Sequence, residues 1–193
     1  GWKYMLPGDF MELSKSTISS IFFSSNFYFY FSGVEYIKQD SLLQPFLHTW
    51  SLSVEEQFYI FFPIFFYLVF KKVKKIFLPS LFFIFVLSFC FAIYGSINFE
   101  ILNFYFPFSR IWEIIFGSII AFFEVEKGSR SKNIFLNQIL QILGVVLILI
   151  SFMNFNDEIK HPSTLTLIPV LGVGLIIWFS QGSEIITKIL SLK

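Results

Sequence analysis

Apolar residues are gathered into six runs along this chain, and charged residues, proline, glycine or asparagine separate one run from the next. A helix needs about 20 mainly apolar residues to cross the roughly 30 Å core of a bilayer. The first run contains many serines, which predicts a helix packed inside a bundle, where small hydroxyl side chains allow close approach. We therefore predict six membrane helices, at approximately residues 13–31, 53–70, 76–94, 108–123, 134–152 and 165–180.

The composition supports an all-α fold, a polytopic membrane helix bundle. Hydrophobic residues make up 55% of the chain and charged residues only 14%, whereas soluble domains carry about a quarter charged residues. The net charge of +1 leaves no basic footprint for a nucleic acid. The single cysteine, Cys90, excludes a disulfide within the chain and a paired-cysteine metal site, and it is expected to be a small buried apolar residue.

Lysine and arginine predict the orientation, because short cytoplasmic loops carry an excess of them. They are concentrated at 71–75, at 127–132 and near both ends of the chain, whereas the segments 32–52, 95–107 and 154–164 hold mainly acidic charges. We therefore predict that both ends of the chain are cytoplasmic. The residues placed at or just below the outer surface are His48, Glu55, Glu56, Arg110 and Glu113.

Two adjacent carboxylates, Glu55 and Glu56, open the second run, where ionised side chains are costly and are usually kept for a function. Ser53 stands three residues before Glu56, which is the spacing of a capping box, so these residues can instead start the helix. Glu55 shares a side with Tyr59, and this pair is predicted to face a cavity, unless Glu55 is merely interfacial. Pro63 lacks a backbone donor and is expected to bend the helix below the carboxylates.

Arg110 and Glu113 lie three residues apart at the start of the fourth run and can pair on one helix face. The guanidinium could hold an anionic or carbonyl group, or meet a carboxylate of the second helix. A purely structural ion pair at the helix end is the alternative. Gly117 and Ala121 continue the helix as a small-residue step, which favours packing.

The chain has two histidines, His48 and His161. His48 precedes Trp50, which is expected to anchor the helix end at the membrane surface. Histidine suits general acid or base catalysis near neutral pH, although a lone exposed histidine is more often incidental. His161 precedes Pro162 in a loop and carries a weaker expectation. The sequence shows no glycine-rich phosphate loop, no serine nucleophile motif and no metal-ligand pair.

Three segments carry a resemblance: Ser25-Asn-Phe-Tyr28, His48-Thr-Trp-Ser-Leu-Ser-Val-Glu-Glu-Gln-Phe-Tyr59 and Arg110-Ile-Trp-Glu-Ile-Ile-Phe-Gly117. In this order and spacing, the chain resembles the acyltransferase 3 family of bacterial inner-membrane proteins. The resemblance implies that an acetyl group moves from acetyl-CoA, a co-substrate rather than a bound cofactor, to a hydroxyl of a lipid-linked or surface glycan such as lipopolysaccharide O-antigen. It also implies that residues 1–193, which begin without a signal-peptide pattern, are the middle of a longer domain whose functional histidine lies upstream.

Acyl transfer sets two chemical requirements. A sugar hydroxyl needs a base, and the carbonyl oxygen of the donor gains negative charge, which needs a cation or a hydrogen-bond donor. We hypothesise that one of the two adjacent glutamates orients or deprotonates a catalytic group or the acceptor. The candidates for catalysis are Glu55, Glu56 and His48, and those for substrate binding are Arg110, Glu113, Tyr59, Ser53 and Trp50. A transporter or flippase that uses the same charges as a path, and a non-catalytic scaffold, are the alternatives.

Overall fold

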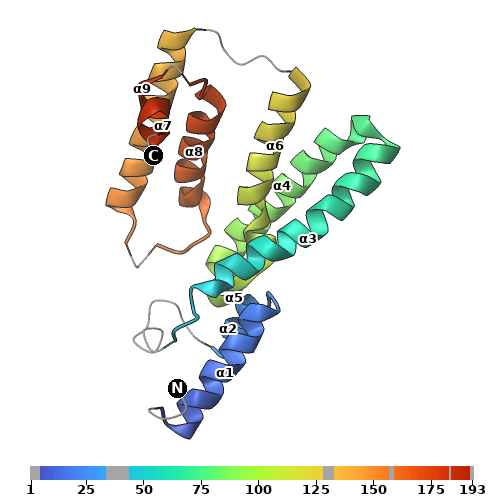
Figure 1. Cartoon of the computed structure of the whole chain (residues 1–193), viewed down its shortest axis with the longest axis vertical. Coiled ribbons are helices and arrows are strands. Elements are labelled where there is room, and N and C mark those ends of the chain that lie inside the picture. The colour runs from blue at the N-terminus through green and yellow to red at the C-terminus, as the bar shows by residue number, and fades with distance from the viewer. Residues whose placement is uncertain (1–4, 34–43, 128–132, 157–158, 183, 192–193) are drawn as a thin grey trace.

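The chain folds as a bundle of helices joined by loops, as predicted. The computed structural model describes residues 5–33, 44–127, 133–156, 159–182 and 184–191, and these residues contain helices but no strand. Figure 1 shows α1 and α2 at one end, a long α3–α4 hairpin beside α6, and α7 with α8 and α9 as a further group. The elements are α1 (Pro7–Ile21), α2 (Ser25–Phe31), α3 (Thr49–Lys72), α4 (Lys74–Asn98), α5 (Glu100–Tyr105), η2 (Pro107–Ser109), α6 (Ile111–Lys127), α7 (Ile134–Asn154), η3 (Thr164–Thr166), α8 (Leu167–Phe179) and α9 (Ile185–Leu190).

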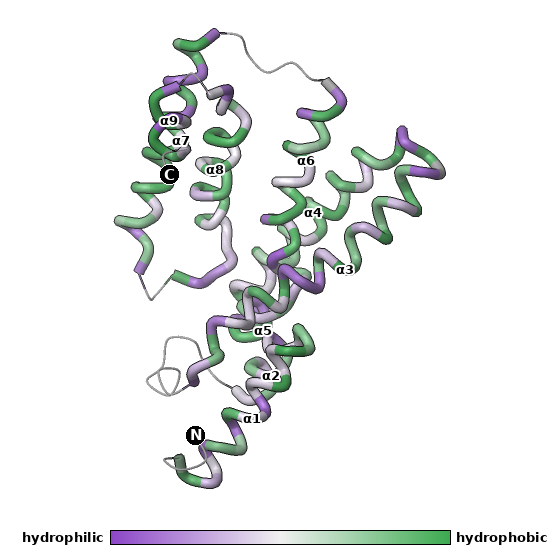
Figure 2. The backbone as a smooth tube through the Cα atoms, in the orientation of Figure 1, coloured by the Kyte–Doolittle hydropathy of each residue, from purple (hydrophilic) through white to green (hydrophobic). Residues whose placement is uncertain are grey.

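Three helices of the described chain are long and apolar enough to cross a bilayer: α3 (over Thr49–Lys71), α4 and α7. The runs predicted at 53–70, 76–94 and 134–152 lie within them. The segment Thr164–Phe179, which holds η3 and α8, is apolar but shorter. Figure 2 shows green, hydrophobic backbone along most of α4 and α7, and purple at several helix ends. Large apolar side chains cover the outer surfaces, which suits contact with lipid.

The predicted single helix over residues 13–31 is wrong, because the chain breaks between α1 and α2. Phe23 has a left-handed backbone (φ 51°), a conformation that costs a non-glycine residue about 1–2 kcal/mol. The N–H of Ser24 donates to the carbonyl of Ser19 (2.8 Å), and the N–H of Phe23 donates to that of Ser20 (3.2 Å). This pair of bonds is the Schellman arrangement that ends a helix. A phenylalanine in the position usually held by glycine gives no sequence signal for such a break.

The α3–α4 hairpin packs against α6 through an aromatic and aliphatic core. Only Val73, whose backbone is not helical (φ −147°, ψ 78°), separates α3 from α4. Phe58 of α3, Phe77 of α4 and Ile115 of α6 are buried in this core. α3 remains helical through Pro63. The C-terminal end of α6 lies beside the tip of the α3–α4 hairpin. There the side chains of Lys74 and Glu126 form an exposed ion pair (2.5 Å).

Two glycines let α7 and α8 approach each other closely. A Cβ atom on Gly144 would lie 2.6 Å from the carbonyl oxygen of Gly172, and one on Gly172 would lie 2.7 Å from that of Gly144. Real Cβ atoms do not come so near a backbone oxygen, so both positions require glycine. The side chain of Asn133 accepts hydrogen bonds from two backbone N–H groups and starts α7.

A buried carboxylate, which the sequence analysis did not single out, fastens α9 to α7. Glu184 is fully buried. Its oxygens accept from the amide of Asn137 (3.3 Å) and from the backbone N–H of Gln181 (3.0 Å). Buried carboxylates persist where hydrogen bonds satisfy them. This contact holds the Asn137 end of α7, which is the end remote from the loop that leads into α8.

Cys90 is exposed on α4, so the expectation that it would be buried is wrong. The inward positions of α4 near it are taken by Ser88 and Ala92, which are buried. The charged residues of segments 34–43 and 128–132, and those at 157–158, on which the predicted orientation partly rests, lie outside the described residues.

Candidate functional site

Arg110 lies at the junction between η2 and α6. Its backbone N–H donates to the carbonyl of Pro107 (2.9 Å), and its carbonyl accepts from the N–H of Glu113 (3.0 Å), so Arg110 leads into the first turn of α6. The guanidinium carbon lies 5.1 Å from the ring centroid of Trp50 and 5.2 Å from that of Phe104. Both distances allow a cation–π contact. One aromatic ring from α3 and one from α5 therefore hold the cation.

Arg110 and Glu113 form the predicted ion pair, with 3.6 Å between Nη1 and Oε1. Their side chains are only 17% and 29% exposed. The Nε of Arg110 is buried and has no hydrogen-bond acceptor among the described residues. A buried donor without an acceptor costs about 1–3 kcal/mol. This nitrogen is therefore a donor that a bound oxygen could satisfy.

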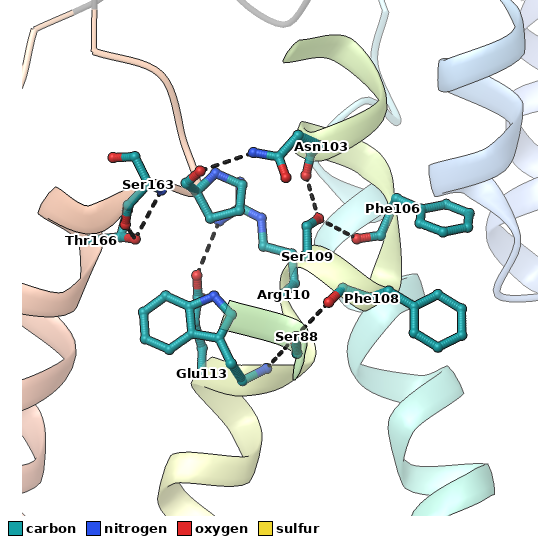
Figure 3. A network of polar contacts seen from close by, with 11 residues as sticks. Ser88, Asn103, Phe106, Phe108, Ser109, Arg110, Glu113, Ser163 and Thr166 are labelled. Carbon is teal, nitrogen blue, oxygen red and sulfur yellow. Dashed lines mark hydrogen bonds and ion pairs between the residues drawn. The ribbon is translucent and has the colours of Figure 1, made fainter. Parts of the chain in front are cut away.

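Serine hydroxyls fix the start of α6 on the neighbouring helices. Ser88 of α4 donates to the carbonyl of Phe108 (2.5 Å) and accepts from the backbone N–H of Trp112 (3.0 Å). Ser109 donates to backbone carbonyls of the α5–η2 segment, including that of Phe106 (2.7 Å). Figure 3 shows these contacts around Arg110. Hydrogen bonds hold the backbone on both sides of Arg110. The guanidinium therefore extends from a fixed backbone position.

The described segment 159–166, between α7 and α8, is tied to the same place. The amide of Asn103 in α5 donates to the carbonyl of Pro162 (2.9 Å), and both residues are buried. Figure 3 shows Ser163 and Thr166 of this segment beside Asn103 and Arg110. Burial, and secondarily the charge of Arg110, lower the pKa of the neighbouring His161. The segment thus forms one wall of the Arg110 site.

The predicted capping box of Ser53 and Glu56 is wrong. α3 begins at Thr49, about one turn earlier, because the chain already turns there and the N–H of Thr49 donates to the carbonyl of Phe46 (3.0 Å). Ser53 is buried, and its hydroxyl lies 2.7 Å from the hydroxyl of Ser25. Ser53 therefore joins α3 to α2 and does not start the helix.

Glu55 and Tyr59 lie on an exposed side of α3 in the described structure, and their predicted position facing a cavity stays a prediction. Both are exposed, and Tyr59 is 55% exposed. The buried face of α3 carries Val54 and Phe58, which are one turn apart. Glu55 and Tyr59 follow these residues by one position and so lie about 100° round the helix. Glu56 is half-buried, and neither carboxylate has a hydrogen bond or ion pair within the described residues.

His48 and Trp50 have different surroundings in the structure. His48 is exposed just before α3 and makes no side-chain cap. Trp50 is only 8% exposed, so it belongs to the core under Arg110 and is not an exposed membrane anchor. Among the residues that the structure describes, no group of three or more His, Cys, Asp and Glu side chains could hold a metal ion.

The three sequence segments that carry the family resemblance meet in space. Asn26 accepts from the side-chain amide of Gln57 (2.9 Å), and Ser25 bonds Ser53, which joins the first segment to the second. Trp50 stacks on Arg110, which joins the second to the third. A sequence model of the acyltransferase 3 family, described as an acyltransferase domain, matches residues 16–192, which is well over half of the chain.

The chain belongs to the acyltransferase 3 family. A Haemophilus influenzae protein named only as uncharacterized is 32% identical over 187 residues, which cover 92% of this acyltransferase 3 chain and 75% of the relative. A Staphylococcus aureus protein whose name gives it, provisionally, as an O-acetyltransferase is 29% identical, with 94% of the chain and 32% of the relative covered. The peptidoglycan O-acetyltransferase OatA of Listeria monocytogenes is 29% identical, with 97% and 32% covered. No solved structure gives a significant match.

An open groove runs along the acyltransferase 3 chain from the ion pair down between α6 and α8, with a volume of about 240 Å³. Glu113 is the polar residue of its lining, and Gly117 and Gly174 line it among apolar side chains. A Cβ atom on Gly117 would meet nothing within 4 Å, so the expectation that Gly117 serves close packing is wrong. Its missing side chain leaves the groove open.

The sequence analysis missed Asn103 and Phe104, which hold the site from α5. It also predicted no helix there, because residues 95–107 look like a loop between two membrane runs. The one available signal was Asn103 itself, an amide in an otherwise aromatic stretch. Gly95 permits this arrangement, since a Cβ there would lie 2.5 Å from the amide oxygen of Asn103.

Proposed function

We propose that the protein containing this chain transfers an acetyl or other acyl group from acyl-CoA to a hydroxyl of a lipid-linked or cell-surface glycan. Membership of the acyltransferase 3 family supports acyl transfer, and the name of the Listeria relative supports a glycan acceptor. Lipopolysaccharide O-antigen and peptidoglycan both present suitable sugar hydroxyls.

The observation that carries the proposal is the enclosed Arg110 guanidinium. It has a free Nε donor, a rigid backbone and two aromatic neighbours, Trp50 and Phe104. Acyl transfer develops negative charge on the carbonyl oxygen, and a fixed donor in a dry site stabilises that charge strongly. Glu113 pairs with the guanidinium and also lines the groove between α6 and α8.

Acyl transfer also needs a base that activates the acceptor hydroxyl. Glu55, Glu56 and His48 are the candidates on this chain, and the exposure of Glu55 and His48 leaves them accessible to a substrate or to other parts of the protein. The Staphylococcus and Listeria relatives are about three times longer than the matched region, so other parts of the protein can complete the site. Glu55 or Glu56 then orients or deprotonates the group that acts on the sugar hydroxyl.

Lysine placement supports a bacterial cytoplasmic membrane protein whose α3–α4 hairpin tip lies inside. The predicted cytoplasmic start of the chain does not fit this orientation, because Figure 1 shows the start of α1 at the end of the molecule remote from that tip. Lys71, Lys74 and Lys75 lie together at the tip of the α3–α4 hairpin, at the far end of α3 from Trp50. In this orientation, acyl-CoA approaches from the hairpin-tip side and the acceptor reaches Arg110 from outside. No bound cofactor is needed, since acyl-CoA is consumed as a substrate.

Expression of the complete protein in a bacterial strain that lacks its own O-acetyltransferases tests the proposal. Mass spectrometry of surface polysaccharide and peptidoglycan should show an acetyl increment on one of them. Arg110→Ala should lower the acetyl content about 10²- to 10³-fold, as loss of a charge-stabilising donor does elsewhere. The same membrane protein level in both strains is the control. Glycan or proton movement without consumption of acetyl-CoA would contradict acyl transfer and favour a transporter.

The role of the two carboxylates is tested by neutral replacements. Glu55→Gln or Glu56→Gln is expected to reduce acetylation at least tenfold at unchanged membrane levels, since an amide cannot accept a proton from the acceptor. Glu12→Gln, a carboxylate replacement on α1, is the matched control. Normal acetylation by both variants at positions 55 and 56 would remove the carboxylates from the mechanism.

A further inference from the structure

The segment 159–166 is held on the Arg110 site by two contacts from α5. The amide of Asn103 in α5 donates to the carbonyl of Pro162 (2.9 Å), and the side chain of Lys160 pairs with Glu100 at the start of α5 (3.0 Å). The first bond is buried and the second is exposed. Because the segment is tied on both sides of His161, that imidazole has a defined position at the outer side of the site.

His161 combines an aromatic face with a hydrogen-bonding ring at this place. Its ring lies 4.9 Å from that of Phe155 and is half-buried. Burial, and secondarily the charge of Arg110, lower the pKa of His161 and so favour the neutral imidazole, which has one N–H donor and one acceptor nitrogen. Neutral donor and acceptor groups beside an aromatic face suit a sugar, which offers hydroxyls and an apolar ring surface.

We propose that His161 is an acceptor-binding residue, which hydrogen-bonds a sugar hydroxyl and, with Phe155, orients the sugar against the Arg110 site. The proposal rests on the glycan acylation proposed above. His161 lies in the connection that enters α8, whereas the lysines of the α3–α4 tip lie at the other end of the bundle. It therefore contacts the acceptor and not the CoA part of the donor.

Kinetics of the complete protein in proteoliposomes separate the two substrates. The acceptor probe is the glycan that gains the acetyl group in the expression strain, isolated unmodified from the same host without the protein. His161→Ala should raise the apparent KM for this glycan about tenfold, which corresponds to the loss of a typical hydrogen bond, and should leave the KM for acetyl-CoA within about twofold. Thr164→Ala, an exposed replacement in the same segment, should change neither KM.

Two further variants distinguish binding from folding. His161→Gln retains a donor and an acceptor and should recover most of the glycan affinity, whereas His161→Phe keeps the ring contact but should bind the glycan as weakly as His161→Ala. An unchanged glycan KM in His161→Phe, or an equal rise in both KM values in His161→Gln, would overturn the proposal. A wild-type protein that acetylates no glycan would instead refute the proposed function, so the two failures are distinct.

Discussion

Arg110 is a residue whose shape matters as much as its charge. The planar guanidinium fits against the rings of Trp50 and Phe104, pairs with Glu113 and still has a buried Nε donor. Lysine is a point charge on a flexible stem, with no planar face and no equivalent of Nε. Replacement of Arg110 by lysine, which is ordinarily a conservative exchange, therefore removes the planar group that the aromatic rings and Glu113 contact.

Arg110→Lys should therefore lose nearly as much acetyl transfer as Arg110→Ala, roughly a hundredfold or more. The measurement is the acetyl content of the host glycan, normalised to the amount of protein in the membrane. Lys160→Arg, in an ion pair that is about half exposed, is a matched exchange that should have little effect. Activity of Arg110→Lys close to that of the wild type would show that charge alone suffices.

Sequence reasoning succeeds for Arg110 and fails for Ser53 for a physical reason. The spacing of Arg110 and Glu113 determines that they share a helix face, whatever surrounds them. The role of Ser53 depends on where α3 begins, and this is set by a turn before Thr49 that has no strong sequence signal. The position of Glu55 depends likewise on which face of α3 the neighbouring helices cover, and those neighbours are remote in sequence.

Among the elements, α7 and α8 form the closest pair. The reciprocal approach of Gly144 and Gly172 allows backbone contact of the kind that drives helix association in lipid, where apolar burial from water is not available. Periodic hydrophobicity predicts both helices, but it does not predict which glycines contact a partner. Gly117, in an equally apolar helix, faces open space.

Gly144→Ala or Gly172→Ala should destabilise the complete protein by about 1–3 kcal/mol, because the added methyl group forces the two backbones apart. Thermal unfolding in detergent micelles, followed by circular dichroism, measures the effect. Gly117→Ala adds the same methyl group without a clash and should not lower the unfolding temperature. Equal destabilisation by all three replacements would contradict a special role of the α7–α8 contact, because helix propensity alone favours alanine over glycine.

For the whole molecule, the orientation in the membrane connects the site to its substrates. The residues around Arg110 and the segment 159–166 lie at one end of the bundle, and the lysine-rich tip of the α3–α4 hairpin lies at the other (Figure 1). The all-helical bundle and the locations of α3, α4 and α7 follow from apolar run length alone. The break at Phe23 and the short helices α5 and α9 do not, because tertiary contacts stabilise them.

Cysteine labelling in intact spheroplasts tests this orientation. In a Cys90→Ser background, Thr164→Cys should react with a membrane-impermeant maleimide from outside, because it is exposed on the site side. Lys75→Cys, which is exposed near the hairpin tip, should react only after the membrane is permeabilised. The reverse labelling pattern would invert the proposed orientation and place the acceptor on the cytoplasmic side.

The glycine contact between α7 and α8 also bears on the order in which the protein is built. Gly144 and Gly172 bring the two helices together, and the helices are neighbours in sequence, so the hairpin can associate in the bilayer as soon as both are inserted. The site, by contrast, needs α5, α6 and the segment between α7 and α8 together. We therefore expect Arg110 to acquire this wall only when the α7–α8 hairpin docks, so that the site is completed late in biogenesis.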